Sequence, residues 1–130
     1  MSPELKYLAF TALLTASLWI PYIVAQVVSN GLLQPMNYVD PTPRPVPLWG
    51  QRANRAHMNA VETFAPFAAL VILVQLTGKN NPTTAFWAMS YFWLRLAHAF
   101  VFLAAIPYVR TLIFVLGYVC VIRLFVELMK

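Results

Sequence analysis

Long apolar runs alternate with polar segments along the chain, and this pattern predicts its secondary structure. Four runs approach or exceed the roughly 20 residues that a helix needs to cross a hydrocarbon core of about 30 Å. We expect helical spans at about 5–28, 52–76, 82–105 and 109–128, with both termini on the same side of the membrane. The sequence therefore predicts an all-α integral membrane protein, a four-transmembrane-helix bundle forming one domain over residues 1–130.

Prolines and polar residues mark the boundaries of these spans. The segment 29–51 is rich in proline, with Pro35, Pro41, Pro43, Pro45 and Pro47. Prolines at this spacing exclude a helix, so we expect an ordered, extended loop over the mouth of a site. Pro21 predicts a kink in the first span, because proline lacks an amide donor and crowds the preceding turn. That span exceeds the apolar core of a signal peptide, about 7 to 15 residues, so no cleavage is expected.

Composition supports the membrane interpretation and narrows the function classes. The 130 residues are 61% hydrophobic and 10% charged, whereas soluble domains carry about 25% charged residues. The net charge of +5 comes without a basic run, a stacking platform or a glycine loop, so nucleic acid is not an expected partner. The single cysteine, Cys120, lies in the last apolar run and is expected to be buried. No disulfide or metal site is predicted.

Basic residues are spread almost evenly over the two ends of the predicted bundle. The loop end carries Arg44, Arg52, Arg55 and Arg110, and the end with the termini carries Lys6, Lys79, Arg123 and Lys130. The balance leans toward placing the loop end in the cytoplasm. We expect a multi-pass protein of a bacterial inner membrane or of an endomembrane.

A polar stripe opens the second span and conflicts with its apolar character. At about 100° per residue, the stripe residues fall within a sector of roughly 80°; they are Arg52, Arg55, Asn59, Glu62 and Pro66. His57 points to nearly the opposite side and is expected to be an anchor or a helix contact. A charge at the depth of Glu62 needs a partner or water, which makes it a functional candidate. Ala56 and Ala60 form a small-residue pair that we expect to serve subunit packing.

A second stripe on the third span comprises Tyr91, Arg95, His98 and Phe102, within about 60° of one another. Arg95 and Glu62 reach similar depths, so Arg95 is expected to be either an ion-pair partner of Glu62 or a ligand contact. His98 is expected to be either a hydrogen-bonded core residue or a second contact. The two stripes can face a shared cavity, and four helices leave so few interior positions that this cavity can lie between protomers.

Arg110 opens the fourth span at the same face as Arg52 and Arg55. Three arginines near one mouth would attract carboxylates and lower the pKa of a nearby thiol by favouring its thiolate. Alternatively, all three face lipid phosphates. The continuation of the stripe to Asn59 and Glu62 favours the ligand site.

Two segments carry a resemblance to a known family. They are Arg52-x-x-Arg55-Ala-His57-x-Asn59-x-x-Glu62 and Pro107-Tyr-Val-Arg110-Thr-Leu-Ile-Phe-Val-Leu-Gly117-Tyr118. With the preceding loop and the following apolar spans, the chain resembles the MAPEG family, the membrane-associated proteins in eicosanoid and glutathione metabolism. The resemblance covers nearly the whole chain.

This resemblance implies a homotrimer of four-helix subunits with glutathione, the co-substrate, bound between neighbouring protomers near the cytosolic face. It implies a glutathione transferase or peroxidase acting on a small hydrophobic electrophile or lipid hydroperoxide that arrives from the lipid bilayer. Arg110 would be the catalytic residue that stabilises the thiolate. The candidate glutathione-binding residues are Arg52, Arg55, Asn59, Glu62, Arg95 and His98.

Three positions depart from the pattern of several eukaryotic members, which carry tyrosines there. Thr63 follows Glu62, and His98 and Phe102 stand on the third helix. Because Phe102 cannot donate a hydrogen bond, a second function stays open: a lipid-binding or scaffold protein that keeps the fold without the chemistry. A small transporter is less favoured, because the chain has neither paired broken helices nor an inverted repeat.

Overall fold

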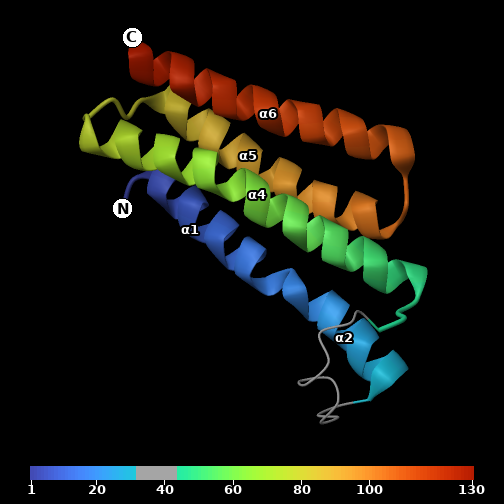
Figure 1. Cartoon of the computed structure of the whole chain (residues 1–130). Coiled ribbons are helices and arrows are strands. Elements are labelled where there is room, and N and C mark those ends of the chain that lie inside the picture. The colour runs from blue at the N-terminus through green and yellow to red at the C-terminus, as the bar shows by residue number, and fades with distance from the viewer. Residues whose placement is uncertain (32–43) are drawn as a thin grey trace.

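The computed structural model describes residues 1–31 and 44–130, and over these residues the chain is helical (Figure 1). The helices are α1 (Pro3–Ser17), α2 (Trp19–Asn30), α4 (Leu48–Leu76), α5 (Pro82–Leu103) and α6 (Pro107–Met129). Together α1 and α2 make one span, so that four helical stretches are long and apolar enough to cross a membrane. The predicted all-α membrane architecture is confirmed.

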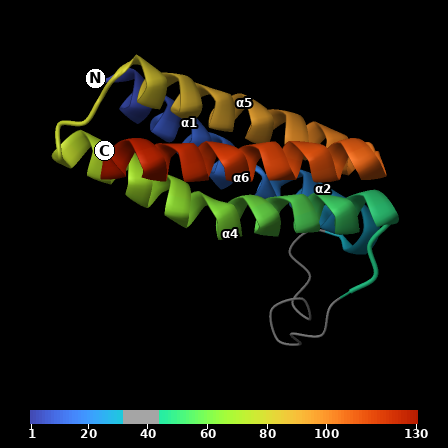
Figure 2. The same cartoon turned by 90° about the horizontal axis from the view of Figure 1, so that it is seen from above.

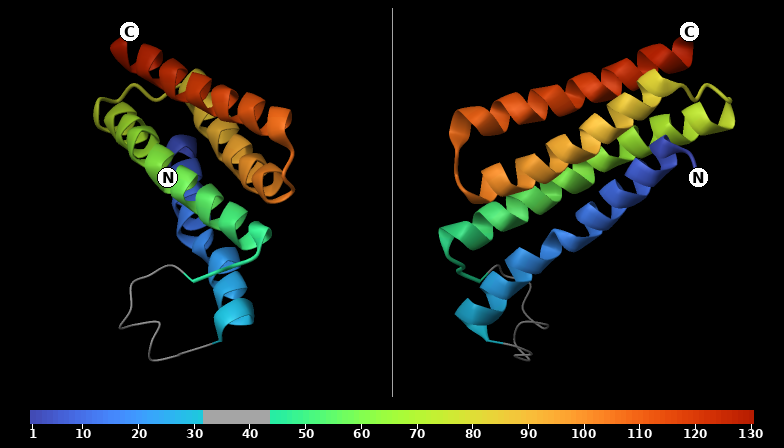
Figure 3. Two further views of the ribbon diagram at one scale, coloured as in Figure 1. Left: turned by 45° about the vertical axis from the view of Figure 1, so that its right-hand side comes forward. Right: turned by 180° about the vertical axis from the view of Figure 1, so that it is seen from behind.

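The helices α4 and α5 lie in the middle of the bundle, with α1 and α2 on one side and α6 on the other (Figures 1 and 2). Both α1 and α6 pack against α4 and α5. The N- and C-termini lie at the same end as the turn between α4 and α5 (Figure 3, right), as predicted. This is called the termini end below, and the opposite end, where α4 and α6 begin, is called the site end.

The first span breaks at the position that Pro21 predicts from the sequence. Helix α1 ends at Ser17, and α2 begins at Trp19, with Pro21 as its third residue. A proline ring collides with the carbonyl of the residue four positions earlier, which here is Ser17, and it removes the hydrogen bond that this carbonyl would accept. The predicted kink is confirmed, and its position follows from the proline.

Several predicted boundaries differ from those of the structure by a few residues. Helix α4 begins at Leu48 instead of Arg52, because the extended Pro47 precedes it and residues 48–51 already form its first turn. The loop predicted at 29–51 therefore shortens at both ends, and its residues 32–43 lie outside the described chain. Helix α5 stops at Leu103 instead of 105, and α6 begins at Pro107 instead of 109.

Small side chains let the helices approach closely. A Cβ added to Gly50 would lie 2.6 Å from the Cβ of Ala25, which shows how tightly α4 meets α2. Ala56 and Ala60 are also buried within the chain. The prediction that they serve subunit packing is wrong, because packing inside one subunit already covers them. Cys120 lies in the apolar core, as predicted.

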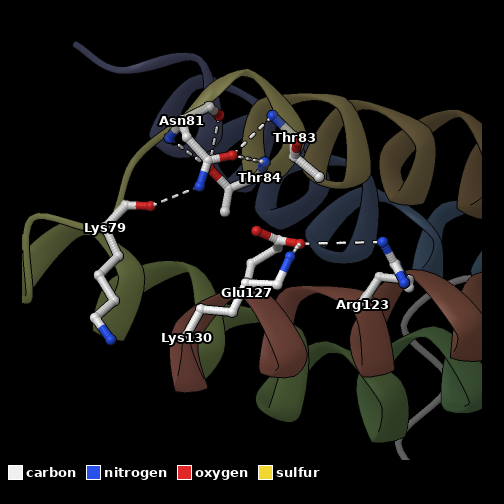
Figure 4. A network of polar contacts seen from close by, with 7 residues as sticks. All are labelled: Lys79, Asn81, Thr83, Thr84, Arg123, Glu127 and Lys130. Atoms are coloured by element: carbon white, nitrogen blue, oxygen red, sulfur yellow. Dashed lines mark hydrogen bonds and ion pairs between the residues drawn. The ribbon is translucent and has the colours of Figure 1, made fainter.

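A polar network closes the termini end (Figure 4). Asn81 caps α5 by accepting hydrogen bonds from the backbone amides of Thr83 and Thr84, at 2.8 and 3.0 Å. The hydroxyl of Thr84 donates to Glu4, whose side chain is 1% exposed. On α6, Glu127 accepts a 2.6 Å hydrogen bond from Lys130.

Candidate functional site

A cavity of about 620 Å³ opens between α4, α5 and α6 toward the site end. Its lining residues are Arg55, Met58, Asn59, Glu62, His98, Phe102, Arg110, Thr111 and Phe114. The first four come from α4, the next two from α5 and the last three from α6. Cations, an acid, an amide and an imidazole therefore share one space with apolar side chains.

The two predicted stripes meet in this cavity. From the stripe on α4 come Arg55, Asn59 and Glu62, and from the stripe on α5 come His98 and Phe102. Helical periodicity places each stripe on one face, and the packing of α4 against α5 turns both faces toward α6. His57, predicted to face away from the stripe, does not line the cavity.

Arg95 lies behind the cavity wall and holds one of its residues. Its Nη1 donates a 3.0 Å hydrogen bond to Oδ1 of Asn59, and its side chain is buried. Its guanidinium also lies 5.2 Å from the centroid of the Tyr91 ring. The alternative ion pair with Glu62 does not form among the described residues. Asn59 takes the place of Glu62 because it lies nearer to the buried face of α4.

The space for the Arg95 guanidinium comes from Gly117 on α6. A Cβ at that position would lie 3.0 Å from Nη2 of Arg95. A side chain at this position would therefore require the guanidinium to shift by a few tenths of an ångström. The glycine stands in the motif that resembles the family, but its role emerges only when α6 is placed against α5.

Arg52 makes a different contact from the other residues of the stripe on α4. It does not line the cavity, and its Nε donates a 3.3 Å hydrogen bond to the carbonyl of Leu103, at the last turn of α5. A cation at a helix C-terminus satisfies free carbonyls and meets the negative end of the helix dipole. Arg52 therefore ties the start of α4 to the end of α5.

Arg110 lies over an aromatic ring at the mouth of the cavity. Its guanidinium carbon is 4.8 Å from the centroid of Phe102. Next to Phe102 stands His98, with ring centroids 5.6 Å apart, and His98 in turn faces Phe114 at 6.2 Å. Arg95 lies 5.4 Å from the centroid of Phe114. Two arginines thus flank a wall of three aromatic rings.

A tight turn brings Arg110 to Phe102. Ala105 has a φ of 60°, and the amides of Ala105 and Ile106 bond back to the carbonyls of Phe102 and Val101. These bonds form the Schellman motif, whose left-handed position usually holds glycine. The turn allows α6 to begin at Pro107, so that Arg110 lies in its first turn.

Three residues that line the cavity are not predicted from the sequence: Met58, Thr111 and Phe114. Met58 and Phe114 belong to apolar runs, where a residue facing lipid and one facing a cavity have the same character. Thr111 follows Arg110, and only the rotation of α6 decides that both reach the cavity. No local pattern distinguishes these three from their neighbours.

Comparison with known proteins identifies the family of this chain. Residues 7–129 match the MAPEG family. The chain belongs to the MAPEG family. No curated protein and no solved structure matches it. Because the chain belongs to this family and has four helices long and apolar enough to cross a membrane, it is a multi-pass membrane protein. The family is concerned with glutathione and eicosanoid metabolism.

Proposed function

We propose that this MAPEG protein is a membrane-bound glutathione transferase that can also act as a peroxidase. The observation that carries the proposal is the cavity whose charges complement a zwitterionic tripeptide. Arg55 offers positive charge to a carboxylate, and Glu62 offers negative charge to an ammonium group. Asn59 uses its carbonyl oxygen on Arg95, so its amide NH₂ remains to donate to the ligand.

Arg110 is the proposed catalytic residue. A guanidinium near the glutathione thiol favours its charged form and lowers the thiol pKa from an ordinary value of about 8.5. The thiolate sulfur donates an electron pair to an electrophilic carbon, and the leaving group departs with the displaced pair. With a lipid hydroperoxide, the sulfur attacks the terminal oxygen, the O–O bond breaks and the alkoxide takes a proton. A second glutathione then forms the disulfide and releases water.

The apolar side of the cavity suits a hydrophobic electrophile. Met58, Phe102 and Phe114 line it together with the polar residues. A substrate dissolved in the bilayer would reach this wall without crossing water. Both substrates would then meet at the boundary between lipid and the polar stripe.

We further propose that the protein assembles as a homotrimer with a neighbouring subunit completing the site. In the single chain, Arg55 and Glu62 are exposed on a membrane-crossing helix, where a charge facing lipid costs about 3 kcal/mol. A second copy packed beside the cavity would cover both side chains. Covering them would also exclude water from the thiolate.

The site end is proposed to face the cytoplasm of a cell whose inner membrane or endomembrane carries the protein. Arg44, Arg52, Arg55 and Arg110 gather there, as the positive-inside rule favours. A reporter fused to the C-terminus should therefore lie on the far side. A cytoplasmic reporter would reverse the orientation.

Calorimetry on the purified protein in detergent tests the function. Glutathione should bind, and the bound thiol should give thiolate absorbance at neutral pH. S-methylglutathione, which lacks the thiol, should bind without that absorbance. The absence of any binding heat at millimolar glutathione would contradict the proposal.

A non-catalytic, lipid-binding or scaffold role is the second candidate. Two observations favour it. Phe102 lacks the hydroxyl of the tyrosines that resembling proteins carry, and an apolar cavity of about 480 Å³ between α5 and α6 includes Trp87 and Trp93. Native mass spectrometry would favour this role if a co-purified lipid stays bound and glutathione neither displaces it nor reacts.

A further inference from the structure

Phe102 lines the cavity beside Arg110, although its side chain can neither donate nor accept a proton. The guanidinium carbon of Arg110 lies 4.8 Å from the ring centroid, inside the roughly 6 Å of a cation–π interaction. We propose that Phe102 is a positioning residue, which holds the Arg110 guanidinium at the cavity for the thiolate. The inference rests on the function proposed above.

The side chain of Arg110 needs a contact that restricts its conformation. It stands in the first turn of α6, half-buried, directly after the turn through Ala105. An arginine side chain has about 2 kcal/mol of rotamer entropy to lose when it is fixed. Among the residues that the structure describes, no carboxylate pairs with Arg110. The Phe102 ring is the contact that can restrict it.

An aromatic ring has an advantage over a carboxylate as the group that positions a catalytic cation. A carboxylate would fix Arg110 but would also cancel its field at the thiol. A phenyl ring attracts the cation through its quadrupole and carries no net charge, so the full positive charge remains for the thiolate. The contrast within this chain is Arg123 at the other end of α6, which lies 5.5 Å from the centroid of the Trp87 ring but also 4.0 Å from the carboxylate of Glu127.

The same cavity contains a matched pair for comparison. Phe114 lies 5.4 Å from the guanidinium carbon of Arg95, much as Phe102 lies from that of Arg110. Replacing either phenylalanine by leucine removes one ring and a similar volume from the cavity. Only the replacement of Phe102 removes the ring beneath Arg110.

The first test needs no ligand. The chain has six arginines, so selective ¹⁵N-arginine labelling gives few side-chain signals, and Arg110→Lys assigns the one of interest. We expect the ring current of Phe102 to shift the Arg110 Nε–H signal. Phe102→Leu should abolish this shift, Phe102→Tyr should retain it, and Phe114→Leu should move the Arg95 signal instead. An Arg110 signal unchanged by Phe102→Leu would overturn the inference.

The second test is kinetic. Phe102→Leu should lower kcat about threefold to thirtyfold, change the KM for glutathione much less, and move the thiolate titration to higher pH. Phe102→Tyr should restore all three quantities. In an Arg110→Ala background, Phe102→Leu should cause no further loss, because the ring acts through the arginine.

The two tests separate failure of the inference from failure of the function. If the Arg110 signal is ring-shifted but wild-type protein binds no glutathione, Phe102 still positions Arg110 and the proposed function is wrong. If wild-type protein is active but the losses from Phe102→Leu and Arg110→Ala multiply, the function stands. Phe102 then has no action through Arg110, and the inference is wrong.

Discussion

The two ends of the bundle use their polar residues differently. At the termini end, most of the described polar side chains bond to one another or to backbone groups, although one carboxylate oxygen of Glu4 has no partner. Asn81 and Thr84 form a reciprocal capping box, in which the backbone N–H of Asn81 also donates to the Thr84 hydroxyl at 2.9 Å. Lys79 donates a 2.8 Å hydrogen bond to the last turn of α6. The charges of this end are largely neutralised within the chain.

At the site end, Arg52 and Arg95 have hydrogen-bond partners, but other charged groups remain available. Helix α6 begins after Ile106 without a side-chain cap, and the preceding turn places Ala105 in the left-handed region. Arg55 and Arg110 form no ion pair with any residue that the structure describes. The site end therefore keeps unneutralised charge that a ligand can use, and its turn keeps a non-glycine residue at a left-handed position.

Removing Arg110 should have the largest effect of any single change at the site end. Arg110→Ala should lower kcat about 10²- to 10³-fold, the usual effect of deleting one group that stabilises developing negative charge. Because the cation lowers the thiol pKa, the remaining activity should rise toward higher pH. Steady-state kinetics as a function of pH measure both effects.

A matched change at the termini end should leave that activity intact. Lys130→Ala removes a cation that pairs with Glu127 on an exposed chain end, and glutathione turnover should stay within about twofold of wild type. Equal losses from the two variants would mean that the ends do not differ as described.

Disrupting the termini end should instead lower stability. Thr84→Val removes the hydroxyl that donates to Glu4, whose other oxygen already has no partner. Leaving this buried carboxylate unsatisfied should cost about 2 kcal/mol of unfolding free energy, measured by denaturing-detergent titration. Glutathione affinity should not change.

A second substitution sharpens this prediction. Adding Glu4→Leu to Thr84→Val removes the stranded carboxylate and should recover most of the loss. A double variant no more stable than Thr84→Val alone would mean that burial of Glu4 is not the cause.

Removing the cap of α5 should have a smaller effect. Asn81→Ala deprives the amides of Thr83 and Thr84 of their acceptor, which should cost about 1 kcal/mol. The same titration measures it, and Thr83→Ala, which leaves the capping oxygen in place, serves as the control.

The smallest expected effects on the free energy of unfolding come from two turn substitutions, one at each end, and they should have opposite signs. Ala105 and Gly78 occupy equivalent left-handed positions, with φ of 60° and 67°. Ala105→Gly should stabilise the protein by about 0.5–1 kcal/mol, and Gly78→Ala should destabilise it by a similar amount. No atom lies within 4 Å of a Cβ added at Gly78, so that change tests the backbone alone. If Ala105→Gly destabilises, the site end carries no strain at this turn.

The features that depend on local periodicity can be predicted from the amino-acid sequence. Four apolar runs, the break before Pro21 and the two polar stripes follow from hydrogen bonding within each helix and from 3.6 residues per turn. These rules need no knowledge of a neighbouring helix. They place Arg55, Asn59, Glu62 and His98 on the two stripes, and these four residues line one cavity. Arg110 is predicted instead from its position at the start of the fourth span and from the resemblance to the family.

The pairing of these residues depends on how the helices pack against one another. Arg95 bonds Asn59 instead of Glu62, Arg52 caps α5, and Arg110 lies over Phe102. Each pairing depends on the rotation and depth of one helix relative to another, which are set by close contacts such as those at Gly50 and Gly117. An ångström-scale fit between side chains determines those contacts, and the pattern of apolar and polar residues along one helix does not encode it.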